Sequence, residues 1–142
     1  MIFEEKYSAC RKDQKLIVSR ESGNVHILRN HDSFSVFQFH VDGRIIKDSC
    51  GERCDYIVEA QKPPRLLAYV IELKGSDLNK ALDQIESTVH MLGEKLKGYQ
   101  VLPRVVIHKT MTHDIQGSRC RRFRKRYPDL VIKCVSLEEA IR

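Results

Sequence analysis

The sequence lacks any apolar run that approaches the ~20 residues needed to cross a membrane as a helix. It also lacks the basic start and the apolar core of a secretory signal, because it begins Met-Ile-Phe-Glu-Glu-Lys. We therefore predict a cytoplasmic protein with no membrane partner. Its 142 residues, 42% hydrophobic and 31% charged, are typical of a single globular domain, which we expect to span residues 1–142.

Several catalytic and cofactor-binding signatures are also missing. The chain contains no P-loop, no dinucleotide-binding G-x-G-x-x-G, no nucleophile elbow and no H-E-x-x-H zinc motif. Its six histidines are dispersed. These absences argue against nucleotide-dependent, serine-hydrolase and zinc-peptidase chemistry.

The cysteines do not form a disulfide framework. There are five, an odd number, scattered along the chain: Cys10, Cys50, Cys54, Cys120 and Cys134. We predict reduced thiols in a reducing compartment. The Cys50-x-x-x-Cys54 pair could supply half of a zinc site, but no second Cys or His pair follows at the spacing of a zinc finger.

Positive charge is concentrated near the C-terminus. The formal net charge is +6, and six basic residues crowd into eight positions: Arg119, Arg121, Arg122, Arg124, Lys125 and Arg126. Such a density predicts binding to the phosphates of nucleic acid, because each phosphate contact releases condensed counterions. The alternative is a solvated helix face, with Phe123 as the residue that anchors the helix to the core.

The most informative feature is an apolar run over 66–71 that ends in Glu72-Leu73-Lys74. The run predicts a strand that is covered on both faces. Side chains alternate along a strand, so Glu72 and Lys74 are expected on one face. Asp55 begins the preceding predicted strand, 54–58, and adjacent strands would bring the three charged groups together. The alternative is that they are ordinary surface charges at strand ends.

Two carboxylates at one strand end form a hard-oxygen site. Such a site suits Mg²⁺ or Mn²⁺, which prefer one or two carboxylates together with water and phosphate oxygens. Asp55 and Glu72 are therefore the candidate metal ligands. Lys74 is a third candidate catalytic residue, which could orient or deprotonate an attacking water.

The pattern of Asp55, then Glu72-x-Lys74, then Gly75 and an amphipathic helix resembles the PD-(D/E)xK nuclease superfamily over residues 34–97. The resemblance implies that both carboxylates hold the metal, that the carbonyl of Leu73 assists them and that Lys74 acts on the water. It also suggests Gln84, in the following helix, as an auxiliary residue. The chain departs from the motif at one position, because Cys54 stands where the motif has proline.

The periodicity predicts one long helix. Its apolar residues recur at spacings of four and three: Leu78, Leu82, Ile85, Val89, Leu92 and Leu96. We expect the helix to run from 76 or 77 to 97, with Ser76 as N-cap and Gly98 as the stop. Packing on a sheet is the simplest use of this stripe, and a dimer seam is the alternative.

From residue 66 onward the predicted order is strand, helix, strand, helix, strand. The later elements are a strand at 104–108, a helix over the basic segment, a strand at 130–135 and a helical turn at 136–141. Earlier elements are a short helix at 3–10 and strands at 16–19, 25–28 and 34–41, the last with a hairpin partner at 44–46. We predict an α/β fold with a mixed central sheet flanked by helices on both faces, and the resemblance implies a restriction-endonuclease-like core.

The sequence therefore predicts an enzyme, a Mg²⁺- or Mn²⁺-dependent nuclease that hydrolyses phosphodiester bonds in nucleic acid. We favour a DNA endonuclease over an enzyme acting on RNA. The alternative is a catalytically inert module of the same fold that binds nucleic acid or a partner. A homodimer or a partner subunit also stays open, since so short a chain has no separate specificity domain.

Overall fold

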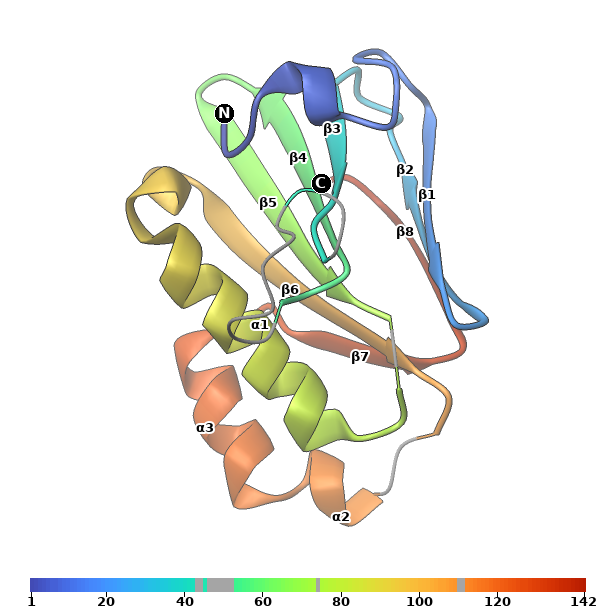
Figure 1. The fold of residues 1–142 in the computed structure, drawn as a ribbon, viewed down its shortest axis with the longest axis vertical. Coiled ribbons are helices and arrows are strands. Elements are labelled where there is room, and N and C mark those ends of the chain that lie inside the picture. The colour runs from blue at the N-terminus through green and yellow to red at the C-terminus, as the bar shows by residue number, and fades with distance from the viewer. Residues whose placement is uncertain (43–44, 46–52, 74, 110–111) are drawn as a thin grey trace.

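The computed structural model describes residues 1–142 except 43–44, 46–52, 74 and 110–111 (Figure 1). The strands are β1 (Leu16–Glu21), β2 (Asn24–Arg29), β3 (Ser35–His40), β4 (Tyr56–Lys62), β5 (Arg65–Glu72), β6 (Gln100–Ile107), β7 (Val131–Cys134) and β8 (Ser136–Ala140). The α-helices are α1 (Leu78–Leu92), α2 (Thr112–Ile115) and α3 (Ser118–Arg126). Short 3₁₀ helices span Glu5–Tyr7 and Gly93–Leu96.

The larger sheet has five strands in the order β3-β4-β5-β6-β7. Its first three strands pair antiparallel, whereas β5, β6 and β7 are parallel to one another. Parallel neighbours need a crossover, and α1 supplies the first while α2 and α3 supply the second. The predicted mixed α/β organisation, with alternating strands and helices from β5 onward, is confirmed.

The helices cover only one face of this sheet (Figure 1). α1 buries one stripe against the sheet and α3, through Leu78, Ala81, Leu82, Ile85 and Leu92. Asp77, rather than Ser76, is the N-cap, and its side chain accepts a hydrogen bond from Lys80 N. The helix stops at Gly93, and the 3₁₀ turn that follows carries the apolar stripe on to buried Leu96.

A second sheet covers the opposite face, which corrects the expectation of helices on both faces. It contains three strands in the order β1-β2-β8, and its Ile17, Leu28 and Leu137 enter the same apolar cluster as Tyr69 and Ile71 of β5. The segment predicted as a helical turn at 136–141 is β8. Its Leu, Glu and Ala residues favour a helix, but parallel pairing with β2 overrides that propensity.

The remaining boundaries differ only locally. The predicted helix at 3–10 is reduced to the 3₁₀ turn Glu5–Tyr7. The predicted hairpin partner at 44–46 lies outside the described residues except for Ile45. Within the described part of the chain, no helix is both long and apolar enough to cross a membrane.

A buried polar cluster joins the two sheets. Glu139 of β8 accepts hydrogen bonds from Arg104 Nε at 2.7 Å and Arg104 Nη2 at 3.0 Å, and its Oε2 lies 2.8 Å from Nε2 of buried His26. Burial opposes the ionisation of Glu139, but the hydrogen bonds from His26 and Arg104 outweigh it and lower the pKa of this carboxyl to about 2. The ionised carboxylate therefore stabilises the packing of β8 and β2 against β6.

We predict that Glu139→Gln lowers the free energy of unfolding at pH 7 by about 2 kcal/mol, the scale of hydrogen bonds to a charged group. Because the folded pKa lies below the ordinary value, the stabilisation is present above about pH 4.5 and is lost as pH falls toward 2. Urea unfolding at pH 7 and pH 3 measures the difference, which should shrink at the lower pH.

Glu138→Gln is the control. Glu138 is exposed and pairs with Arg29 at 2.9 Å, so its loss should change stability little. Equal effects of the two substitutions would contradict a stabilising role for the buried cluster.

Candidate functional site

The structure places Asp55 and Glu72 side by side. Asp55 directly precedes β4, and its N–H donates to the Ile71 carbonyl of β5 at 3.0 Å. Its Oδ2 accepts from the N–H of Leu73 at 2.7 Å, so Asp55 is bonded to the residues on both sides of Glu72. Both side chains are fully buried, at 0% exposure. The two carboxylates singled out from the sequence therefore share one enclosed position.

This position lies beneath α1. Glu72 has the same strand parity as Ala68 and Val70, which pack in the core between the sheet and the helices. Thr88 of α1 accepts a hydrogen bond from Cys54 N at 2.8 Å and donates one to the Gln84 carbonyl at 2.8 Å. α1 thus holds the main chain directly before Asp55.

The electrostatics of Cys54 also place the carboxylates near one another. Burial raises the pKa of the Cys54 thiol; the hydrogen bond with Thr88 opposes this effect, and the Glu72 and Asp55 carboxylates raise the pKa further. Cys54 is also one half of the alternative zinc site. Cys50, the other half of the zinc alternative, lies outside the described residues.

The peptide of Leu73 is held from two directions. Its N–H donates to Asp55 Oδ2 at 2.7 Å, and its carbonyl accepts from Asn24 Nδ2 of β2 at 2.5 Å. The predicted metal donor, the Leu73 carbonyl, therefore lies next to Asp55 and already accepts one hydrogen bond. Lys74, the third predicted catalytic residue, lies outside the described residues.

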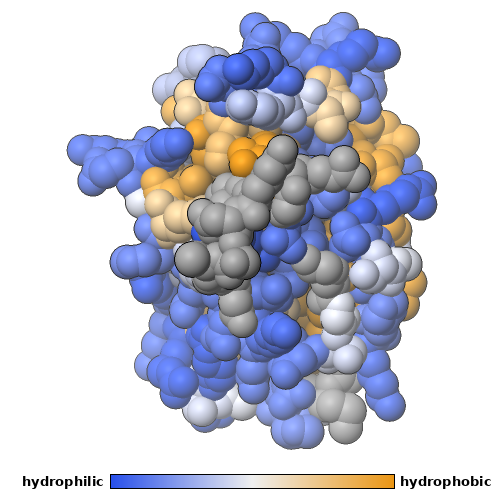
Figure 2. Space-filling model, in the orientation of Figure 1, coloured by the Kyte–Doolittle hydropathy of each residue, from blue (hydrophilic) through white to orange (hydrophobic). Residues whose placement is uncertain are grey.

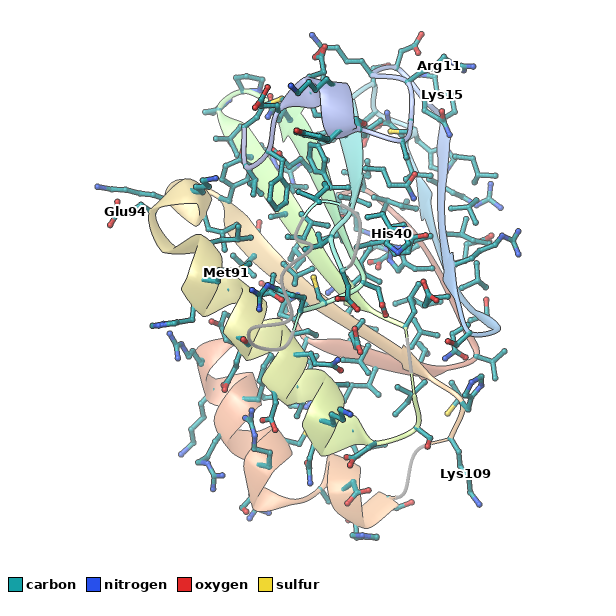
Figure 3. All side chains as sticks on the ribbon, viewed as in Figure 1. Arg11, Lys15, His40, Met91, Glu94 and Lys109 are labelled. Carbon is teal, nitrogen blue, oxygen red and sulfur yellow. The ribbon has the colours of Figure 1, made fainter. Side chains whose placement is uncertain are left out.

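A cavity of about 530 Å³ opens directly after this strand end. It is lined by Gly75, Ser76, Asp77, Lys80 and Gln84. Gln84, the predicted auxiliary residue, therefore lines this cavity together with the first turn of α1. Lys109, labelled in Figure 3, extends outward from the loop after β6 at this same end of the molecule.

The basic segment forms α3, beside α1, but its six cations are not equivalent. Arg119 binds two carboxylates of α1, Asp83 at 2.7 Å and Glu86 at 3.0 Å. Half-buried Arg124 donates to the Leu130 carbonyl at 3.1 Å. Four cations are exposed: Arg121, Arg122, Lys125 and Arg126. Phe123 is buried, so the helix is anchored in the core as the alternative interpretation of this segment expected.

α1 separates the basic helix from the strand end. Asp83 and Glu86 contact α3, whereas Gln84 and Thr88 lie toward the chain before Asp55. Successive residues of an α-helix are rotated by about 100°, so these two pairs occupy different flanks. The surface over α1 and α3 is largely hydrophilic in Figure 2.

Among the described residues, no group of three or more His, Cys, Asp or Glu side chains is arranged to hold a metal ion. The candidate donor set is thus two carboxylates and a main-chain carbonyl. No family model matches the chain, and neither the curated proteins nor the solved structures contain a significant match to it. We therefore infer the function from the geometry of this site.

Sequence reasoning missed the role of Thr88. A signal existed, because Thr88 falls three residues after Ile85 and four before Leu92, both of which are buried. A polar residue at that spacing lies within the buried stripe of the helix and needs a hydrogen-bond partner. Its partner, the N–H of Cys54, could not be identified from local sequence.

We predict that Thr88→Val lowers the free energy of unfolding by about 2 kcal/mol, because the isosteric change leaves the buried Cys54 N–H without its acceptor. Chemical denaturation monitored by circular dichroism measures the loss. Thr88→Ser keeps the hydroxyl and should retain most of the stability. If Thr88→Ser costs as much as Thr88→Val, packing of the methyl group, and not the hydrogen bond, holds this segment.

Proposed function

We propose that this chain is a metal-dependent nuclease in which Asp55 and Glu72 hold Mg²⁺ or Mn²⁺. One observation carries the proposal: at one end of the sheet, the fully buried Asp55 is hydrogen-bonded to both neighbours of the fully buried Glu72. Neighbouring like charges in a low-dielectric interior repel strongly, and a divalent cation compensates both at once. Carboxylate and carbonyl oxygens are also the ligands that these metals prefer.

The arrangement of the larger sheet supports this proposal. The alternation of strand and helix from β5 to β7 is the order that the resemblance to the PD-(D/E)xK superfamily implies. The pair Asp55 and Glu72 also occupies the ends of two adjacent strands, with α1 following directly. We propose that the five-stranded sheet and its helices form a restriction-endonuclease-like core, and that the three-stranded sheet is an addition to it.

Each residue of the site has a distinct proposed role. When bound, the metal would act as a Lewis acid that polarises the scissile phosphate and offsets charge on the leaving oxygen. Asp55, oriented by the Leu73 N–H, and Glu72 would hold it, and the Leu73 carbonyl has a second lone pair for the same purpose. Lys74 would orient or deprotonate the water, and Gln84 would contact substrate in the cavity.

The exposed face of α3 supports a nucleic acid as the substrate. Arg121, Arg122, Lys125 and Arg126 are the cations that we propose contact backbone phosphates. Arg119 is not included among these phosphate-binding cations, because its guanidinium already binds Asp83 and Glu86. A nucleic acid carries a phosphate at every nucleotide, so one such molecule could contact this face as well as the strand end. We favour DNA over RNA.

The test is cleavage of linear, circular and single-stranded DNA and of RNA, with Mg²⁺, Mn²⁺ or EDTA. We expect the wild type to cut with metal and not in EDTA. Asp55→Asn and Glu72→Gln should each lower the rate by a factor of about 100 or more. Each removes one of the two carboxylates that would hold the metal ion, and the charge of that ion stabilises the transition state.

Glu59→Gln is the matched control. Glu59 is a buried carboxylate of β4, the strand that follows Asp55, but it accepts hydrogen bonds from Ile2 N at 2.9 Å and Tyr99 Oη at 2.5 Å. Its substitution should lower stability and preserve cutting. Wild-type activity in a folded Asp55→Asn protein would overturn the proposal. Metal-independent binding without cleavage by the wild type would favour the inert nucleic-acid-binding module instead.

A further inference from the structure

We propose that Asn24, from the smaller sheet, is a positioning residue for the metal site, an inference that rests on the proposed function. Its Nδ2 donates to the Leu73 carbonyl at 2.5 Å, and the N–H of that same residue donates to Asp55 Oδ2 at 2.7 Å. Two hydrogen bonds therefore connect Asn24 to the carboxylate through a single residue. Asn24 touches neither the carboxylates nor the reacting atoms and acts by orienting Leu73.

The turn before Asn24 fixes its place. Ser22 and Gly23 have φ of +52° and +82°, and positive φ at both central residues is the geometry of a two-residue hairpin turn. Asn24, the first residue of β2, pairs with Glu21 of β1. A Cβ on Gly23 would lie 3.6 Å from His108 Cε1, so the turn abuts the loop after β6. The hairpin thus reaches the end of the larger sheet where the carboxylates lie.

The Asn24 side chain is only partly satisfied in its buried position. It is 1% exposed, and within the described part of the chain its Oδ1 is buried without a hydrogen-bond partner. An unsatisfied buried acceptor costs free energy. The Nδ2 atom, in contrast, makes a short contact to the main chain between Glu72 and Lys74. The amide is better explained by the orientation of Leu73 than by its own packing.

This orientation matters for a metal in two ways. The Leu73 carbonyl, itself a proposed donor, keeps a fixed direction because Asn24 occupies one of its lone pairs. The Leu73 N–H keeps Asp55 Oδ2 in place, which limits the rotation of the carboxylate. Residues that orient metal ligands in this way typically change metal affinity 10- to 100-fold when they are replaced.

Asn30 offers a matched control on the same sheet. It is also 1% exposed and follows β2 directly, but its amide is fully bonded. Its Nδ2 donates to the Gln14 carbonyl at 3.0 Å and the Phe34 carbonyl at 2.8 Å, and its Oδ1 accepts from Phe34 N at 2.9 Å. Asn30 therefore stabilises a loop at the opposite end of β2 from Asn24.

The experiment compares Asn24→Ala and Asn30→Ala in the full chain. Calorimetric titration with Mn²⁺ gives metal affinity, urea unfolding gives stability, and hydrogen exchange followed by NMR gives the protection of the Leu73 amide without metal. Asn24→Ala should weaken Mn²⁺ binding about 10- to 100-fold and speed exchange of the Leu73 amide. It should also lose some stability, because the buried Leu73 carbonyl loses its hydrogen bond. Asn30→Ala should lose stability and bind Mn²⁺ with unchanged affinity.

Two results would overturn the inference alone: wild-type Mn²⁺ affinity in Asn24→Ala, or equal weakening in both variants, which would reflect general destabilisation. Failure of the wild-type protein to bind Mn²⁺ or Mg²⁺ would overturn the proposed function and this inference together. The wild-type titration therefore distinguishes the two failures.

Discussion

The pairing register of β4 with β5 is the constraint on which the candidate site depends. Asp55 precedes one strand and Glu72 ends the other. The observed pairing places Asp55 against Ile71 and Leu73, the two residues that flank Glu72. A slip of one residue would turn one carboxylate away from the other, because side chains alternate along a strand. Buried apolar residues on both faces of β5 hold the register, since a slip would also misplace the entire core.

Each layer of the molecule then contributes one contact to the site. From the helical layer, Thr88 holds the chain at Cys54, directly before Asp55. From the opposite layer, Asn24 holds Leu73, directly after Glu72. The cluster of Glu139, Arg104 and His26 holds the smaller sheet against β6. It thereby positions the β1–β2 hairpin so that Asn24 can hydrogen-bond to Leu73. Packing on both faces thus positions the same strand ends.

Local patterns in the sequence were sufficient for much of this arrangement. Period-two alternation located β5 and the face of Glu72, and the spacing of four and three located α1. The features that the sequence did not predict depend on contacts with residues distant in the chain. β8 has a helix-favouring composition, and only its pairing with β2 makes it a strand. From the sequence, Arg119 was predicted to bind phosphate, but in the structure its guanidinium pairs with Asp83 and Glu86 of α1. Asn24 carries no local signal, because its partner lies 49 residues away.

A crystal structure of the wild-type protein grown with Mn²⁺, with anomalous data collected at the manganese edge, tests the central claim most directly. The account predicts one anomalous peak between Asp55 and Glu72, at about 2.0–2.4 Å from an oxygen of each carboxylate. A peak bound to other residues, or a Mn²⁺-containing crystal with no peak at this pair, would contradict the claim that the two carboxylates form a metal site.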